Sequence, residues 1–407
     1  MRVYHLSSAP FAGGAARAGF RLHEGLLREP NVKSLWLDAG GGAHGPSVLN
    51  LPHPPKSRSL LLRLRRNKWA KITQRHFAST TPPASKPIGW GSIEMLEKLP
   101  RPDVWNLHWV SWFLDWENLL PWMAEQAPIV WTLHDLNPLR GIWHYEPQPE
   151  ERTPERLKYE AEAIEIKRRA LSKIPKDRLT FVGPSRWMVE ECRKSRITAG
   201  FRCENMPYGL NTEVFKNRPK EKIREIFGIP DEEFVIGFVA DSVNDPRKGM
   251  RLLMEAIDLL AAKHNNLYLL AVGSGQLKTT SLRCTQVGSV ANDVLLSYIY
   301  SACDVFVCPS TQDNLPNTVL EALACNVPVV GFEIGGLPDL VSSELQGTLG
   351  RFNGGAASLA AAISSRIQSR SNAWNEQIPF SYSLESQAQS YLQLYGSFIN
   401  RSEIDNG

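Results

Sequence analysis

Short apolar runs alternate with longer amphipathic stretches along almost the whole chain, and this alternation constrains the fold more than any other feature. Each run is brief, rich in Val, Ile, Leu or Phe, and bounded by turn residues. That pattern is typical of parallel strands that are covered by helices on both faces of a sheet. The runs form two series, the first over 3–7, 32–38, 103–110, 129–134 and 179–184, and the second over 234–240, 267–273, 305–309 and 327–332.

The two series predict an α/β fold with two doubly wound, Rossmann-like parallel sheets, because single cores seldom exceed about 250–300 residues and this chain has 407. A charged, proline-containing stretch after Pro207 is typical of a linker, so we expect domains over 1–207 and 208–380. Apolar residues at helical spacing predict a final helix over 381–400. Ligands of such sheets bind outside the carboxyl ends of the strands, so two domains facing across a cleft would line it with these loops.

The composition excludes several classes of protein. With 43% hydrophobic and 22% charged residues, the chain is neither disordered nor collagen-like. Its apolar runs are far shorter than the roughly 18 residues of a membrane span, and its first residues do not read as a secretory signal. Six scattered cysteines without a C-x-x-C pair favour a reducing, cytoplasmic location.

A basic segment over 56–75 stands out against a net charge of only +4. No acidic residue occurs between Asp38 and Glu94, and the cations of the segment are interleaved with leucine, tryptophan and isoleucine. A basic amphipathic segment of this kind binds anionic lipid or a phosphate-bearing ligand, so we expect peripheral contact with a membrane. A solvated loop and helix is the alternative, and we expect no nucleic-acid partner.

Two loops of the first series carry candidate binding residues. Gly13 and Gly14 follow a strand and precede a helix, where close backbone approach and N–H groups suit an anion. A tight turn is the alternative, and without G-x-G-x-x-G spacing a dinucleotide site is not supported. His134 ends another strand, where it would donate to a hydroxyl or polarise a reacting group. A structural His134 beside a capping Asp135 is the alternative there.

A cationic loop follows the first strand of the second series. Arg247 and Lys248 are adjacent, and Gly249 leads from them into a helical pattern. Arginine forks onto phosphate oxygens and lysine supplies a point charge, so the pair is predicted to bind an anion. A solvated surface pair is the alternative.

The loop over 309–316 joins a strand to a helix that is predicted to start at Pro316. The unpaired N–H groups and the positive dipole end of that helix favour phosphate. Glu321, about one turn into the helix, would accept hydrogen bonds from two vicinal hydroxyls, and Asp313 stands in the loop before it. Ordinary N-capping by Asp313 and Asn314 is an alternative that is compatible with binding.

No metal site is predicted. The chain contains no D-x-D triplet, and a divalent ion that bridges a diphosphate usually needs clustered carboxylates. It also lacks H-E-x-x-H, P-loop and nucleophile-elbow motifs. We therefore expect no metal and no cofactor, with leaving-group charge falling on Arg247, Lys248 and the helix start.

Trp109, Trp112 and Trp116 share helical spacing within a tryptophan-rich region. Aromatic faces of this kind stack on sugars, and they also form ordinary core or interface packing.

The chain resembles family 4 retaining glycosyltransferases, which have the GT-B architecture, over nearly its whole length. The most specific part is 313–328, which looks like the family's Glu-x7-Glu element with Asp313 in place of the first glutamate. A glycine-rich turn at 335–339 follows it. The segment 300–310 looks like the strand that leads into the Glu-x7-Glu element. The segments that are similar to the members building bacterial exopolysaccharide, capsule or O-antigen are 106–109, 131–135, 245–249 and 273–275.

The resemblance implies a role for each domain and for the candidate residues. The second domain would bind a nucleotide sugar, the first would bind the acceptor, and the helix over 381–400 would pack back on the first. Glu321 would take the ribose hydroxyls, and Arg247 and Lys248 the diphosphate. Asp313 and His134 would contact the transferred sugar. Further contacts with the donor would come from Gly13, Gly14, Val290, Asn314, Leu315, Pro316, Asn317 and Thr318.

The sequence is therefore interpreted as a metal-independent, retaining hexosyltransferase of polysaccharide biosynthesis. It would move a hexose from a UDP- or GDP-sugar to a saccharide or lipid-linked saccharide, in the cytoplasm and at the inner face of the cell membrane. Two alternatives stay open. One is a non-catalytic nucleotide-sugar-binding subunit of a polysaccharide assembly complex, for which Asp313 is the only support. The other is an inverting transferase or epimerase of the same architecture.

Overall fold

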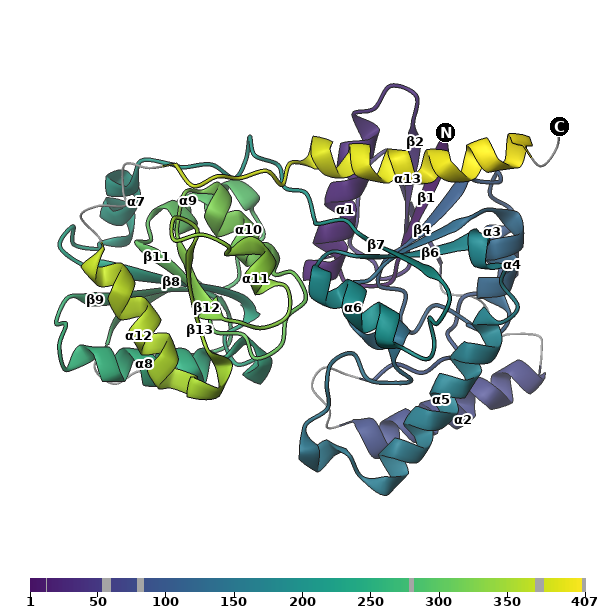
Figure 1. The fold of residues 1–407 in the computed structure, drawn as a ribbon, viewed down its shortest axis with the longest axis horizontal. Coiled ribbons are helices and arrows are strands. Elements are labelled where there is room, and N and C mark those ends of the chain that lie inside the picture. Colours follow the sequence, from purple (N-terminus) through teal and green to yellow (C-terminus); the bar gives the residue numbers. More distant parts are fainter. Residues whose placement is uncertain (12, 53–59, 79–83, 278–281, 370–376, 405–407) are drawn as a thin grey trace. The chain divides into compact units, whose positions relative to one another are not determined.

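The structure is a computed structural model that describes residues 1–11, 13–52, 60–78, 84–277, 282–369 and 377–404. The chain divides into two compact units. Unit 1 comprises Met1–Pro207 together with Glu385–Gly407, and unit 2 comprises Tyr208–Leu384. Figure 1 shows the fold of both units, which are described separately below.

Unit 1 is built on a seven-stranded sheet in the order β3-β2-β1-β4-β5-β6-β7, and every pairing in it is parallel. Its strands are β1 (Arg2–Ser7), β2 (Lys33–Asp38), β3 (Val48–Asn50), β4 (Val104–Leu107), β5 (Ile129–Thr132), β6 (Leu179–Gly183) and β7 (Arg202–Asn205). Its helices are α1 (Gly14–Leu27), α2 (Leu60–Phe77), α3 (Ile93–Leu96), α4 (Leu119–Gln126), α5 (Pro154–Leu171), α6 (Arg186–Lys194) and α13 (Leu384–Ile404).

Unit 2 contains a six-stranded parallel sheet in the order β10-β9-β8-β11-β12-β13. Its strands are β8 (Phe234–Ser242), β9 (Leu267–Ser274), β10 (Arg283–Gln286), β11 (Val305–Cys308), β12 (Val329–Phe332) and β13 (Gly347–Gly350). Its helices are α7 (Lys220–Phe227), α8 (Met250–Ala261), α9 (Asp293–Ser301), α10 (Asn317–Ala324), α11 (Leu337–Leu340) and α12 (Gly355–Gln368). Each sheet reverses its strand order beside its first strand, which is the doubly wound arrangement. The predicted fold class is confirmed.

The strands that the sequence did not predict are those at the edges of the two sheets. All nine predicted strands are present, and the additional ones are β3, β7, β10 and β13. β7 reads Arg-Cys-Glu-Asn and is half-exposed, whereas every residue of the central strand β4 is buried. An edge strand has one solvated side, so it carries no continuous apolar run to reveal it.

The C-terminal helix α13 packs on the sheet of unit 1. Its Tyr391 and Tyr395 are fully buried in one cluster with Val3, Val104 and Val130 from the central strands. Figure 1 shows α13 in yellow beside α1 and the strands of this unit. Burial of such aromatic side chains stabilises the fold by about 2 kcal/mol each, so α13 is an integral part of unit 1.

The tryptophan spacing does not correspond to a helix. Residues 109–116 form an irregular loop with a turn over 111–113, in which Trp112 has a φ of 65° and is 36% exposed, while Trp116 is buried. The three tryptophans follow β4 in a loop that is held by tertiary packing. Lys167 of α5 lies 4.7 Å from the ring centre of Trp116, which therefore belongs to the interior.

Candidate active site

Two loops at the carboxyl ends of adjacent strands in unit 2 hold the predicted cations and the predicted acid. Arg247 and Lys248 lie in a 3₁₀ turn after β8, and Asp313 lies in the loop after β11. The backbone N–H of Thr311 donates to the carbonyl oxygen of Arg247 at 2.8 Å, which joins the loops. Gly249 has a φ of 75°, and a Cβ there would lie 1.9 Å from the carbonyl oxygen of Pro309. Only glycine allows this approach.

The side chains of these loops meet at the Asp313 carboxylate. Lys248 Nζ lies 2.6 Å from Asp313 Oδ2, and an Arg247 guanidinium nitrogen lies 3.8 Å from the same oxygen. The Ser310 hydroxyl donates to Oδ2 at 3.2 Å, and the backbone N–H of Asn314 donates to Oδ1 at 3.1 Å. The Arg247 and Lys248 side chains are only 17% and 23% exposed, so they do not form a solvated surface pair.

The charge of Asp313 is stabilised by these partners. Burial by itself raises the pKa of the carboxyl, but Lys248, Arg247 and the Ser310 hydroxyl outweigh that effect and hold its pKa below the ordinary value. Asp245 also pairs with Arg247, at 3.3 Å, so two carboxylates and two cations meet at this edge of the sheet. Arginine and lysine side chains that are held by carboxylates here are suited to bind phosphate oxygens in exchange for them.

Helix α10 begins beside this cluster. Pro316 is the residue before its first turn, and no side chain caps the helix. Asp313 and Asn314 therefore do not act as ordinary N-caps, because the carboxylate accepts from Lys248, Ser310 and Asn314 N–H instead. Asn317 and Thr318 are half-buried at the helix start, whereas Asn314, Leu315 and Pro316 are buried. The Val319 N–H donates to the Pro316 carbonyl at 3.1 Å, and the uncapped start of α10 presents the positive end of the helix dipole.

Glu321 lies one turn into α10 and is only 2% exposed. The hydroxyl of Tyr300, from α9, donates to Glu321 Oε2 at 2.8 Å. A charge-assisted hydrogen bond from a fixed phenol orients the carboxylate. Tyr300 is a positioning residue for Glu321 that the sequence analysis did not identify, because only the packing of α9 against α10 brings the two together.

The glycine-rich turn supports Asp313 from the next loop. Gly335 has a φ of 50°, and a Cβ at this position would lie 1.8 Å from the carbonyl oxygen of Asp313. This close backbone contact explains why glycine is required after β12. Val290 is half-buried and follows β10, and the Gly273 N–H donates to the Gly288 carbonyl at 2.8 Å. Val290 therefore lies on a further loop of the same carboxyl edge, outside the Asp313 cluster.

In unit 1 the glycine loop and His134 lie on separate strand-to-helix connections. Gly13 is the N-cap residue of α1, and α1 starts at Gly14. The Gly13 N–H donates to the Pro10 carbonyl at 2.8 Å, and its own carbonyl accepts from Arg17 N–H. The glycines thus form a tight turn at a helix start, which is compatible with both of the interpretations offered by the sequence.

Asp135 has a structural role. Its Oδ2 accepts from Trp109 Nε1 at 2.6 Å and lies 2.5 Å from His144 Nδ1, and its Oδ1 accepts from Asn137 N–H at 2.9 Å. Burial by itself raises the pKa of Asp135, but His144 and these hydrogen bonds hold it below its ordinary value. Asp135 therefore anchors the irregular loops around His134.

His134 is buried, with 8% exposure, and its Nε2 lies 3.1 Å from His108 Nδ1. Burial lowers its pKa to about 4, against a smaller opposing effect of Asp135. His134 is therefore a neutral imidazole at pH 7. It is suited to donate or accept a hydrogen bond and unsuited to supply a positive charge.

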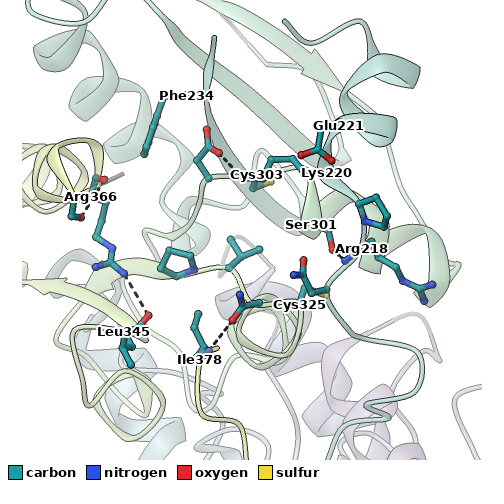
Figure 2. Close-up of a pocket in the computed structure, with 17 residues that line it drawn as sticks. Arg218, Lys220, Glu221, Phe234, Ser301, Cys303, Cys325, Leu345, Arg366 and Ile378 are labelled. Atoms are coloured by element: carbon teal, nitrogen blue, oxygen red, sulfur yellow. Dashed lines mark hydrogen bonds and ion pairs between the residues drawn. The ribbon is translucent and has the colours of Figure 1, made fainter. Parts of the chain in front are cut away.

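A pocket of unit 2 lies away from these residues, at the amino ends of the strands (Figure 2). It is lined by Phe234 at the start of β8 and by Asp304 just before β11. Asp304 is fully buried and paired with Lys220 and Arg224 at 2.8 and 2.7 Å, and Arg366 donates to backbone carbonyls. None of the predicted site residues lines this pocket.

Among the residues that the structure describes, no group of three or more His, Cys, Asp or Glu side chains is arranged to hold a metal ion. The candidate site at the carboxyl edge of this sheet is therefore the cluster of Asp313, Lys248, Arg247 and Asp245.

The architecture of the chain is GT-B. A family profile described as "Glycosyl transferases group 1" matches residues 233–369, which include the loops around Asp313 and all of α10. The "Putative teichuronic acid biosynthesis glycosyltransferase TuaC" of Bacillus subtilis is 32% identical over 157 residues, covering 38% of this chain and 38% of that relative. The chain therefore matches well under half the length of this curated relative.

Solved structures are similar over almost the whole chain. Sucrose-phosphate synthase from Thermosynechococcus elongatus superposes with a TM-score of 0.67 at 17% identity, covering 98% of this chain and 100% of that one. HepE of Anabaena, solved in complex with UDP and glucose, superposes with a TM-score of 0.64 at 18% identity over 98% and 100% of the two chains. These likenesses establish the fold of both units.

Proposed function

We propose that this chain is a retaining glycosyltransferase that moves a hexose from a nucleotide-diphosphate sugar to a saccharide or lipid-linked saccharide in polysaccharide biosynthesis. The observation that carries the proposal is the cluster of Lys248, Arg247 and Asp313 beside the start of α10, inside the segment that matches a glycosyltransferase family. TuaC is named for teichuronic acid biosynthesis, and HepE binds UDP, which agrees with this class of acceptor and donor.

In the proposed reaction, the donor's diphosphate exchanges places with the Asp313 carboxylate. Lys248 and Arg247 move from Asp313 to the phosphate oxygens, and the N–H groups at the start of α10 donate to the same group. Asp313 is then available to the hydroxyls of the sugar, and Glu321 holds the ribose. The Asp313 side chain is one methylene shorter than glutamate, so it reaches less far toward the sugar.

The chemical step is electrostatic on this account. The bond between the anomeric carbon and the diphosphate breaks while the sugar develops oxocarbenium character. The acceptor oxygen forms its bond to the anomeric carbon on the same face, and its proton passes to the departing diphosphate. Preorganised cations and N–H groups stabilise the charge that grows on the diphosphate. The residues present supply that charge without a metal, so we expect turnover in the presence of EDTA.

The test is incubation of the purified chain with a panel of UDP- and GDP-sugars, followed by mass spectrometry for released nucleotide. A glycosyltransferase hydrolyses its own donor slowly when no acceptor is present. One donor should be hydrolysed, and proton NMR of the released sugar should show retained configuration. Tight binding without any product would favour a non-catalytic subunit, and inverted product or an altered nucleotide sugar would favour the alternative transferase or epimerase.

We also propose that unit 1 contacts anionic membrane at the cytoplasmic face through α2. Residues 56–59 of the basic segment lie outside the described residues, and the rest forms this helix. Trp69, Ile72 and Phe77 are buried against unit 1, while Leu61 and Leu64 are 68% and 58% exposed. Among the described residues, no helix has the length and apolar character needed to cross a bilayer.

Some cations of α2 form ion pairs within unit 1, and others are exposed. Arg65 pairs with Glu117 and Lys68 with Glu162, which attaches the helix to unit 1. Three cations remain exposed without an ion-pair partner among the described residues, namely Arg63, Lys71 and Arg75. Each cation near an anionic surface contributes about 1 kcal/mol, so the three together support reversible binding.

Flotation with vesicles that contain phosphatidylserine measures this contact. The Lys71→Glu/Arg75→Glu variant should lose most of its bound fraction at low salt, because two attractions become repulsions. The matched control is Lys194→Glu, an exposed cation on α6. Equal flotation of the wild type and the α2 variant would contradict a role for α2, and so would absence of binding by the wild type.

A further inference from the structure

Three imidazoles form a continuous hydrogen-bonded chain through the interior of unit 1. His5 Nδ1 lies 2.9 Å from His108 Nε2, and His108 Nδ1 lies 3.1 Å from His134 Nε2. His5 is on β1, His108 follows β4, and His134 follows β5. The three are 0%, 2% and 8% exposed, so the chain reaches the carboxyl edge of the sheet at His134.

A second branch connects the same chain to the C-terminal helix. The hydroxyl of Tyr395 on α13 donates to Asn106 Oδ1 at 2.7 Å. The amide nitrogen of Asn106 then faces His108 Nε2 at 3.0 Å and the Thr132 hydroxyl at 3.2 Å. The Thr132 hydroxyl also lies 2.9 Å from the hydroxyl of Tyr391.

The direction of each hydrogen bond follows from the Asn106 amide. Its oxygen accepts from Tyr395, so its NH₂ group donates to His108 Nε2. A neutral imidazole that accepts at Nε2 carries its proton on Nδ1, so His108 donates to His134 Nε2. His134, which accepts at Nε2, must then carry its own proton on Nδ1.

The opposite direction leaves more buried donors unsatisfied. With the amide turned over, the Tyr395 hydroxyl and the Nε2–H of His5 would both lack an acceptor among the described residues. In the observed direction His5 Nε2 is a bare acceptor, in agreement with its lack of a hydrogen-bond partner, and His5 donates from Nδ1. The lone pair of His108 Nε2 is then shared by the His5 and Asn106 donors, and one hydroxyl proton of the Thr132–Tyr391 pair is left over. With the amide turned over, one hydrogen of its NH₂ group also lacks an acceptor among the described residues. Each buried unsatisfied group costs about 1–3 kcal/mol, which favours the observed direction.

We propose that Tyr395, Asn106 and His108 are positioning residues that fix His134 as the neutral Nδ1–H tautomer. In this tautomer Nδ1 of His134 is a hydrogen-bond donor and Nε2 is an acceptor. The catalytic part of this inference rests on the proposed function, whereas the tautomer does not. Burial keeps the chain neutral, since it lowers the pKa of His5, His108 and His134 alike.

The tautomer is measured directly by ¹⁵N–¹H correlation NMR of the histidine side chains at pH 7. His134 should show a protonated Nδ1 and a bare Nε2 in the wild-type chain. Tyr395→Phe removes one hydroxyl and should convert this signal into a mixture of tautomers, because the Asn106 amide is then free to turn over. Tyr391→Phe is the matched control on the same helix and should retain the single tautomer. A protonated Nε2 in the wild type, or no change in Tyr395→Phe, would overturn the proposal.

Turnover of the donor identified above tests the consequence for activity. His108→Leu removes the donor to His134 and should lower kcat about tenfold with little change in KM. His108→Asn places an amide donor near the former Nδ1 position and should recover most of the loss. His23 is another fully buried histidine, bonded to Ser34 and Ser47, and His23→Gln should stay close to wild type.

Failure of the proposed function and failure of the positioning role would give different results. If the wild-type chain shows the Nδ1–H tautomer but no sugar nucleotide turns over, the proposed function is wrong and the proton order stands. If turnover is normal in Tyr395→Phe and in His108→Leu, the positioning role is wrong and the proposed function stands.

Discussion

Replacing Lys248 by alanine should lower kcat by about 10²–10³-fold, which corresponds to the loss of one preorganised group facing a developing anion. The reason is that the ammonium would stabilise charge that appears on the diphosphate only as the bond to the sugar breaks. Nucleotide affinity should fall less than kcat, because the ground-state diphosphate retains Arg247 and the helix start. The measurement is donor turnover, with thermal unfolding as the check on folding.

Arg251→Ala is the matched control for this change. Arg251 lies three residues further along, is exposed, and pairs only with Glu255 on the surface of α8. It should keep full turnover. A Lys248→Ala variant with an unchanged kcat would remove the leaving-group argument, because no other ammonium lies against Asp313 among the described residues.

Replacing Glu321 by alanine should weaken binding of the nucleoside diphosphate by about 100-fold. A buried carboxylate that accepts from two ribose hydroxyls makes charge-assisted hydrogen bonds of about 1.5–3 kcal/mol each, and part of that is recovered by water in the variant. Isothermal titration calorimetry with UDP and GDP measures the loss and identifies the base that the site prefers.

Two further variants distinguish a loss of nucleotide binding from a loss of folding when Glu321 is replaced. Glu321→Gln keeps an acceptor for the Tyr300 hydroxyl and should lose only about tenfold in affinity, with normal unfolding. Glu255→Ala, an exposed acid on α8, should bind as the wild type does. Equal affinity of Glu321→Ala and wild type would refute the ribose assignment.

The sequence predicted the parts of this fold that depend on local pattern. The central strands carry continuous apolar runs because both faces of a parallel sheet are covered, so β1, β4, β8 and β11 could be located to within a few residues. The edge strands could not, because a four-residue segment such as β10 (Arg-Cys-Thr-Gln) has neither an apolar run nor an alternating pattern.

The candidate site was predictable as a set of loops but not as a set of contacts. Arg247, Lys248 and Asp313 could each be placed after a strand of the second series. Their ion pairs required the alignment of β8 with β11, which no local pattern specifies. The position of Tyr300 against Glu321 has the same origin.

The histidine chain shows more clearly which contacts the sequence alone could not predict. His5 and His108 come from strands far apart in the sequence, and Tyr395 from a helix almost 300 residues beyond Asn106. A histidine at a strand end indicates a candidate site, but its proton order depends on partners that only tertiary packing assembles. The helical spacing of Trp109, Trp112 and Trp116 does not correspond to a helix, because these residues lie in an irregular loop after β4.

The most direct test of the central claim is a crystal structure of the chain with UDP or GDP bound. The account predicts the terminal phosphate within hydrogen-bond distance of Lys248 Nζ and the first N–H groups of α10, with Asp313 released from Lys248. A diphosphate bound away from this edge of the sheet, or an ion pair between Lys248 and Asp313 that persists beside bound nucleotide, would contradict it.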